Sequence, residues 1–172
     1  MKMKKNTDSL NKKLLTAAVS AAKAKEVKDL LSQGAEINCK NEWGLSPLML
    51  AAQYNPSVAV LNALIAAGAD IHDQEPKYRS NVLLLACNKT TNPKIVEALL
   101  GAGAKLDERN YLGETAIIMA VNTNPEARVV TALIKAGANI NDRDYQGHSV
   151  LEYAKLNKRT YLINTLKQMG AN

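Results

Sequence analysis

Apolar residues recur along the chain in five stretches of helical spacing, and each stretch ends at a Gly-Ala pair. The glycines occupy positions 34, 68, 103, 137 and 170, so they are 33 to 35 residues apart. A branched aliphatic residue lies seven and four residues before each glycine, and residues at these offsets share one face of a helix. Glycine readily adopts the left-handed conformation that often follows the last helical turn. The pattern predicts five amphipathic helices that each end at a glycine.

A second, shorter helix is predicted before each of these, and its clearest copy follows Gly44. There Ser46 can cap the helix and Pro47 fits its first position, ahead of an apolar run that ends in two alanines. Related stretches follow Gly113 and Gly147. Helix pairs repeated at a period of about 33 residues are typical of solenoids, in which each unit packs on its neighbours.

These stretches resemble the ankyrin repeat, whose pattern is Gly-x-Thr-Pro-Leu-His-x-Ala-Ala, then an apolar helix, then Gly-Ala-Asp-x-Asn. The resemblance covers residues 11–172 and implies an all-α fold, a solenoid of about five helix-turn-helix repeats with short β-hairpin fingers. Residues 1–10 are polar and basic, and we expect a flexible tail there. The remainder is expected to form a single domain with repeats at 11–40, 41–74, 75–109, 110–143 and 144–172.

The chain departs from the family pattern at several places. Met49 stands where the family has His, so the hydrogen bond that this His usually makes is missing. Residues 74–81, where the finger of the third repeat is expected, contain neither Gly nor Thr-Pro, and this repeat is one residue longer than the others before its inner helix. This departure predicts a distorted hairpin, which is either a contact site or the result of sequence drift. Asn-Pro pairs at 55–56, 92–93 and 124–125 are expected to begin the outer helices, with Asn as the cap.

Residues 12–24 allow two interpretations. A basic start, a short apolar run and the sequence Ala22-Lys23-Ala24 resemble a secretory signal with its cleavage site, which would make the protein periplasmic or secreted. Alternatively, the run is the inner helix of the first repeat, because Ala17 lies 17 residues before its glycine, like the equivalent alanines of later repeats. This register favours the helix and a cytoplasmic protein.

The two cysteines, Cys39 and Cys87, fall at non-equivalent places in different repeats. Cys87 replaces an alanine of an inner helix, so we expect it to be buried. No disulfide is expected, which fits a reducing compartment.

The net charge of +6 is concentrated at the two ends of the sequence. Residues 1–13 and residues 155–172 each carry +4, so the rest of the chain carries −2. A basic stripe for nucleic acid along the middle repeats is therefore not indicated. Electrostatic tethering of the basic ends to an acidic surface remains an alternative function.

The resemblance implies that partners dock on the concave face, which is formed by the finger tips and the ends of the inner helices. The positions that correspond to this face are Glu42, Trp43, Leu45, Gln53, Tyr54, Lys77, Tyr78, Ser80, Asn88, Lys89, Tyr111, Leu112, Glu114, Asn122, Thr123, Tyr145, Gln146, His148 and Asn157. Charged residues are expected to tune the specificity of this surface, namely Lys77, Arg79, Lys89 and Glu114.

Aromatic residues are concentrated on this predicted face. The chain has one Trp, six Tyr and no Phe. Trp43, Tyr78, Tyr111 and Tyr145 fall on finger tips, and Tyr54 lies beside them. Trp and Tyr are enriched at binding hot spots, so the pattern favours a binding surface. The alternative is that each finger tyrosine packs on the next finger as a structural spacer.

The sequence contains no convincing catalytic or metal-binding pattern. Its only histidines are His72, at a structural turn, and His148, at a variable finger position. His, Cys and acidic residues do not recur at metal-ligand spacing, and no nucleophile is paired with a base. We therefore expect a non-catalytic, monomeric module that binds a protein partner and needs no cofactor, metal or small-molecule substrate.

Overall fold

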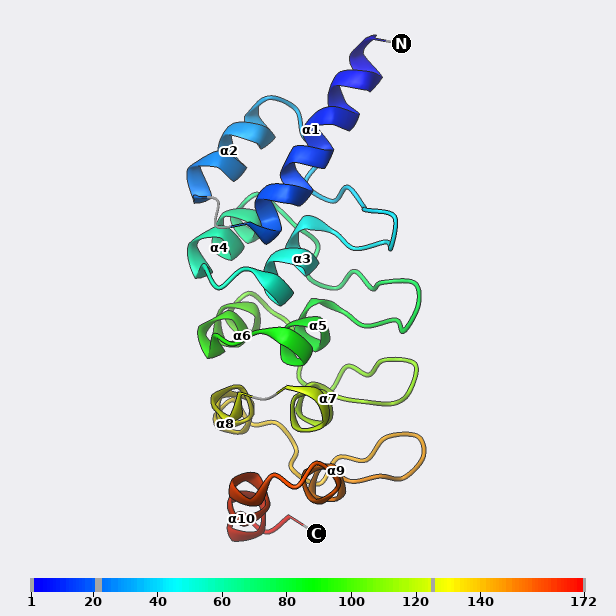
Figure 1. Cartoon of the computed structure of the whole chain (residues 1–172), viewed down its shortest axis with the longest axis vertical. Coiled ribbons are helices and arrows are strands. Elements are labelled where there is room, and N and C mark those ends of the chain that lie inside the picture. Colours follow the sequence, from blue (N-terminus) through cyan, green and yellow to red (C-terminus); the bar gives the residue numbers. More distant parts are fainter. Residues whose placement is uncertain (1, 21–22, 125, 172) are drawn as a thin grey trace.

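The computed structural model describes residues 2–20, 23–124 and 126–171, and these residues form ten α-helices stacked as five pairs (Figure 1). The helices are α1 (Lys2–Val19), α2 (Ala24–Ser32), α3 (Pro47–Tyr54), α4 (Val58–Ala66), α5 (Val82–Lys89), α6 (Pro93–Gly101), α7 (Ala116–Thr123), α8 (Ala127–Lys135), α9 (Val150–Leu156) and α10 (Thr160–Gln168). The all-α repeat solenoid predicted from the sequence is confirmed.

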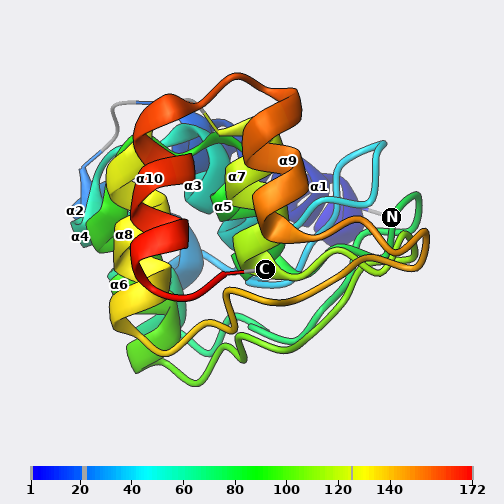
Figure 2. The same ribbon diagram turned by 90° about the horizontal axis from the view of Figure 1, so that it is seen from below.

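The helices form two parallel columns. The odd-numbered, inner helices pack on one another along one column, and α2, α4, α6 and α8 do the same along the other. Long loops connect each outer helix to the next inner helix and extend from the inner column to one side (Figure 1). Viewed along the stack, these loops lie over one another beyond the inner helices (Figure 2). We call them the second finger (33–46), third finger (67–81), fourth finger (102–115) and fifth finger (136–149).

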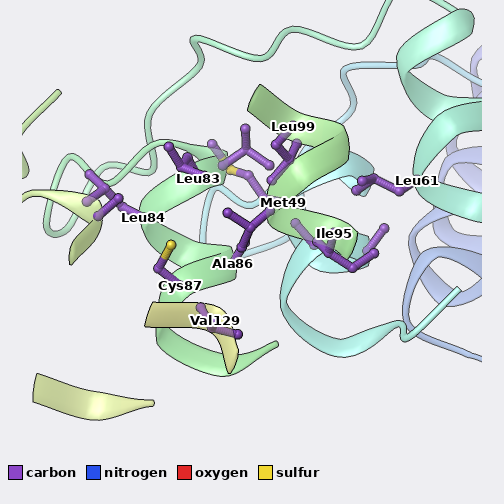
Figure 3. Packing of buried hydrophobic residues seen from close by; sticks show 14 of the residues in the cluster. Met49, Leu61, Leu83, Leu84, Ala86, Cys87, Ile95, Leu99 and Val129 are labelled. Carbon is purple, nitrogen blue, oxygen red and sulfur yellow. The ribbon is translucent and has the colours of Figure 1, made fainter. Parts of the chain in front are cut away.

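The core runs the length of the stack between the two columns. Around α5 and α6 it contains Met49 and Leu83 from inner helices, Leu61 and Leu99 from outer helices, and the thiol of Cys87 (Figure 3). Cys87 is completely buried, as predicted, and both cysteines are free thiols. Small and branched side chains let successive helices approach closely, which explains how a chain without Phe fills its core.

Each predicted helix stop adopts the expected geometry. The glycines at 34, 68, 103, 137 and 170 have φ of +101°, +86°, +103°, +94° and +86°. The alanine after each glycine donates its N–H to a carbonyl five residues back, as Ala69 does to Leu64 at 3.1 Å. This hydrogen bond satisfies a carbonyl that the end of the helix leaves unpaired.

The N-terminal segment is helical, which corrects the prediction of a flexible tail over residues 1–10. Helix α1 begins at Lys2 and contains neither Gly nor Pro. Leu10, Leu14 and Ala17 follow one another on one face of α1 and are buried. The buried position of Ala17 agrees with the interpretation of this segment as the inner helix of the first repeat. The possible cleavage site Ala22-Lys23-Ala24 lies partly outside the described residues.

The expectation that Asn-Pro pairs begin the outer helices is confirmed only for α6, where Asn92 accepts the N–H of Lys94. Helix α4 begins later and is capped by Ser57, and α8 is capped by Glu126. Pro125 lies outside the described residues. Asn55 and Asn124 lie before these caps: their Oδ1 atoms accept the N–H groups of Ser57 and Glu126, at 2.9 and 2.8 Å, and their Nδ2 groups bind the neighbouring repeat.

These asparagines form part of a set of polar clamps between successive repeats. The buried Asn55 side chain donates from Nδ2 to two carbonyls at the end of α1, at 3.2 and 2.6 Å. Asn124, also buried, donates to the carbonyls of Cys87 and Thr90 at the end of α5, at 2.9 and 3.0 Å. The Arg159 guanidinium donates to the carbonyl of Ala120 at the end of α7, at 3.4 Å. These clamps fix the ends of α1, α5 and α7 relative to the repeat that follows each of them.

Candidate functional site

The fingers are held by side-chain acceptors at their bases more than by β-ladders. Within the described residues the fingers contain only isolated antiparallel bridges, Gln74 with Asn81 and Arg143 with Ser149. The acceptors are Asn41, Asn110 and Asp144 in the second, fourth and fifth fingers. Each uses Oδ1 to accept the backbone N–H groups two and four residues later, at 2.8 to 3.0 Å. The chain therefore turns tightly around each acceptor, and Trp43 and Tyr145 project at the tip.

The third finger reaches the same shape with different residues. Glu75 replaces the Asn or Asp, and its carboxylate accepts the N–H groups of Lys77, Tyr78 and Ser80 at 2.7, 2.8 and 3.1 Å. The side chain of Glu is one methylene longer than that of Asp, which accommodates the one extra residue in this finger. The expected distortion is therefore confined to the tip, where Arg79 has φ of +56°.

Neighbouring fingers contact one another. The N–H of Tyr111 donates to the carbonyl of Tyr78 at 2.8 Å, and the N–H of Tyr145 donates to the carbonyl of Leu112 at 3.1 Å. The rings of Tyr78 and Tyr111 stack with centroids 5.9 Å apart and planes at 28°. A side chain at Gly113 would collide with Tyr145, whose atoms lie 2.6 Å from the position of a Cβ. This close approach keeps the third, fourth and fifth fingers in register.

The aromatic side chains predicted at the binding face are all exposed. The exposed fractions are 67% for Trp43, 53% for Tyr54, 40% for Tyr78, 53% for Tyr111 and 72% for Tyr145. Glu42, Lys77, Lys89, Gln146 and His148 are exposed as well, whereas Leu45 and Leu112 are partly buried. Most of the predicted residues are thus accessible on the fingers and at the ends of the inner helices.

Three predicted surface residues are buried and are corrected here. Gln53, Ser80 and Glu114 are 8%, 2% and 5% exposed. The Glu114 carboxylate accepts hydrogen bonds from the Nδ2 groups of Asn110 and Asn122, at 2.7 and 3.2 Å. It therefore joins the fourth finger to α7, and this structural role excludes it from tuning specificity. No local pattern predicts this role, because Asn122 lies eight residues away in α7.

Exposed cations lie at the tip of the third finger, Lys77 and Arg79, and at the C-terminal end of α5, Lys89. The Lys77 ammonium lies 4.7 Å from the centroid of the Tyr78 ring, a cation–π contact. Lys77, Arg79 and Lys89 form no ion pair with any of the described residues. By contrast, Arg109 is held by the carbonyls of Gly113 and Arg143, at 2.6 Å each, and by the carboxylate of Asp142.

The fifth finger contains a cluster of polar side chains around Asp144. The Tyr153 hydroxyl donates to Asp144 Oδ2 at 2.7 Å, and His148 Nδ1 lies 3.3 Å from the same oxygen. Burial raises the pKa of Asp144, but hydrogen bonds from Tyr153, His148 and Gln146 outweigh burial and lower it. Burial and the hydrogen bond to Asp144 raise the pKa of Tyr153. The cluster is thus a charged acceptor that holds the finger tip.

In residues 2–20, 23–124 and 126–171, no three His, Cys, Asp or Glu side chains are grouped as metal ligands would be. None of the helices in the described part of the chain is both long enough and apolar enough to cross a bilayer.

Comparison with known proteins identifies the family to which this repeat architecture belongs. The family model for ankyrin repeats, which describes three copies, matches residues 14–110 and 83–172. Two curated relatives each align with 103 residues, or 60% of this chain: the ankyrin repeat and KH domain-containing protein mask-1 of Caenorhabditis elegans, at 35% identity, and the L-asparaginase of Dirofilaria immitis, at 29%. The chain spans only 4% and 17% of the lengths of these relatives. Since the family match extends over most of the sequence, this chain belongs to the ankyrin-repeat family.

Proposed function

We propose that this protein is a non-catalytic module that holds a protein partner on its concave face, defined as the tips of the four fingers and the exposed ends of the inner helices. Ankyrin repeats are generally protein–protein interaction modules and are typically non-catalytic. Membership of the family therefore supports the class of function. The choice of face depends on the side chains that this chain exposes.

The observation that carries the proposal is the placement of the aromatic residues. Five of the seven aromatic side chains in the sequence lie on this surface, and each is at least 40% exposed. These residues are Trp43, Tyr54, Tyr78, Tyr111 and Tyr145. Trp and Tyr contribute large apolar contact areas at low entropic cost, and they dominate binding hot spots. An exposed row of such residues supports a contact surface for another protein.

A purely structural role explains only part of this row. The stacked rings of Tyr78 and Tyr111 do act as a spacer between the third and fourth fingers. Tyr145 likewise packs on the fourth finger at Gly113. Within the described residues, however, Trp43 contacts no other aromatic ring, although it is 67% exposed. Spacing of the fingers therefore does not account for Trp43, nor for the large exposed area that Tyr145 keeps.

The L-asparaginase match does not support an enzymatic role. It covers 17% of that enzyme, and the aligned part of this chain is a helical repeat array. The aligned residues supply no grouping of a nucleophile with a base on the described surface. We therefore propose no catalytic activity for this chain.

Affinity capture tests this function. The wild-type protein and a variant with alanine at Trp43, Tyr78, Tyr111 and Tyr145 are used as baits in lysate of the source organism. The expected result is a protein retained by the wild type and lost by the variant, because truncation of hot-spot aromatics removes most of the binding free energy. Circular dichroism establishes that both baits are folded.

A matched control replaces an exposed aromatic outside the fingers. Tyr161 on α10 is 66% exposed, so Tyr161→Ala removes a similar area from another part of the surface. This variant is expected to retain the partner. A partner held equally by the wild type and the four-alanine variant would place the binding site elsewhere and contradict the proposal.

A further inference from the structure

We infer that the cleft between the third, fourth and fifth fingers binds an acidic segment of the protein partner, with Arg79 as the anchor for one of its carboxylates. This inference rests on the proposed function and specifies the chemistry of the partner. The cleft has a volume of about 330 Å³ and is lined by Gln74, Arg79, Arg109, Asn110, Tyr111 and Tyr145.

The backbone of Arg79 has an unfavourable conformation. Its φ of +56° is left-handed, a conformation that a Cβ makes unfavourable. Gly44, Gly113 and Gly147 occupy the corresponding position of the other three fingers, with φ of +76°, +82° and +89°. The third finger therefore keeps a strained arginine where the other fingers have a residue that is free of this strain.

The side chain of Arg79 gives no compensating contact within the described part of the chain. It is exposed, and it takes part in no side-chain hydrogen bond or ion pair with a described residue. Local strain that is retained without a stabilising contact is typical of functional positions. The guanidinium is thus available to a molecule from outside.

The chemistry of the cleft suits a carboxylate. Guanidinium groups bind carboxylates in a bidentate manner, and the Gln74 amide and the hydroxyls of Tyr111 and Tyr145 can donate further hydrogen bonds. Arg109 is already oriented by carbonyl oxygens and by Asp142, so its position is fixed before binding. Tyr111 and Tyr145 line the same cleft and are also exposed at the tips, which joins it to the proposed contact surface.

Local charge favours an acidic peptide. Lys77 and Arg79 are exposed at the third tip, while the carboxylate of Glu75, at the base of the same finger, is buried and accepts three backbone N–H groups. The fourth and fifth tips, Tyr111-Leu112 and Tyr145-Gln146, carry no charge. A nucleic-acid backbone requires a row of cations along its path, whereas a single cationic tip beside aromatic rings fits one or two carboxylates of a peptide.

The test is a titration followed by nuclear magnetic resonance of the full chain. The probes are an oligoglutamate peptide, an oligoglutamine peptide of equal length, and an oligouridylate. We expect oligoglutamate to shift the Arg79 Nε–H resonance and the amides of Tyr111 and Tyr145, and oligoglutamine to leave them unchanged. Added salt should weaken the binding.

Three variants distinguish the effect of the positive charge of Arg79 on peptide binding from the effect of its left-handed backbone on stability. Arg79→Gly is expected to bind oligoglutamate about tenfold more weakly, because it loses a charge-assisted bidentate contact, while its melting temperature equals or exceeds that of the wild type. Arg79→Lys keeps the charge but loses the planar fork, so intermediate affinity is expected. Lys158→Gly is the matched control, since Lys158 is also left-handed, with φ of +54°, and the substitution likewise removes one positive charge. This control should bind like the wild type.

The inference is overturned if oligoglutamate shifts none of these resonances, if oligoglutamine shifts them equally, or if Arg79→Gly binds like the wild type. Stronger shifts with oligouridylate would assign the cleft to nucleic acid and overturn it as well. A captured partner that is lost by the four-alanine variant but retained by Arg79→Gly would refute this inference while leaving the proposed function intact.

Discussion

A single acceptor side chain at the base of each finger sets the shape of its tip. Asn41, Asn110 and Asp144 each accept two backbone N–H groups through one oxygen. In the longer third finger, the carboxylate of Glu75 accepts three backbone N–H groups. These residues lie beside the exposed aromatics. The geometry of the finger tips therefore depends on polar groups that are wholly or partly buried at the bases of the fingers.

Asp144→Asn tests this role through the dependence of stability on pH. Asn serves as the acceptor in two other fingers, so the variant should fold, with a loss of about 1 kcal/mol at neutral pH from the weaker, uncharged acceptor. The lowered pKa of Asp144 means that the folded state favours its carboxylate. Its contribution to stability is therefore present above the unfolded pKa of about 3.9 and is lost as the pH falls through the folded pKa.

Urea denaturation of the wild type and Asp144→Asn at neutral and acidic pH measures this effect. The difference in unfolding free energy between the two proteins should shrink as the pH falls below about 3.9, because Asp144 becomes protonated. The other carboxyl groups titrate in both proteins, so their contributions cancel in this difference. A difference that stays constant across this range would show that the charge of Asp144 does not hold the finger.

At the scale of the elements, hydrogen bonds across the junctions fix each helix pair relative to the next. Asn124 is fully buried, and its amide bridges the end of α5 to the loop before α8. Asn124→Ala leaves two carbonyls at the end of α5 without this donor. Since unsatisfied buried polar groups are costly, the unfolding free energy should fall by about 1–3 kcal/mol.

Asn62→Ala is the control for Asn124→Ala. Asn62 is exposed on α4, so its replacement should change the unfolding free energy by no more than about 0.5 kcal/mol. Chemical denaturation followed by circular dichroism measures both. Equal effects of the two substitutions would mean that the junction clamp contributes nothing to stability.

Elements that depend on neighbouring residues in the sequence could be predicted, and those that depend on distant residues could not. Helix ends at Gly68 and Gly137 were predictable because the left-handed stop and the apolar spacing are local properties. The helical N-terminus was missed because residues 4–9 are mostly polar, and Leu10 is buried only by residues that the fold brings to it. The roles of Asn55 and Glu114 depend on partners in another repeat or another element, and no local pattern in a single sequence reveals them.

At the scale of the whole molecule, each repeat is stabilised only by its own helices and its neighbours. Leu64 lies in the central core and has no exposed surface. Leu64→Asp buries an unpaired charge there, so it should lower the unfolding free energy by more than about 4 kcal/mol and unfold the second repeat.

Asn62→Asp places the same carboxylate two residues away on the exposed face of α4 and serves as the control. It should change the melting temperature little. Thermal unfolding followed by circular dichroism compares the two variants. Similar melting of Leu64→Asp and the wild type would contradict the assignment of the core face.

Hydrogen–deuterium exchange of the free protein and of its complex would show whether the partner occupies the fingers and the inner helices. We expect slower exchange in the complex at the tips of the second to fifth fingers and at the ends of α3, α5 and α7. Exchange in α4, α6 and α8 should be unchanged. Protection confined to these outer helices, with unchanged fingers, would place the partner on the opposite face and refute the proposed binding mode.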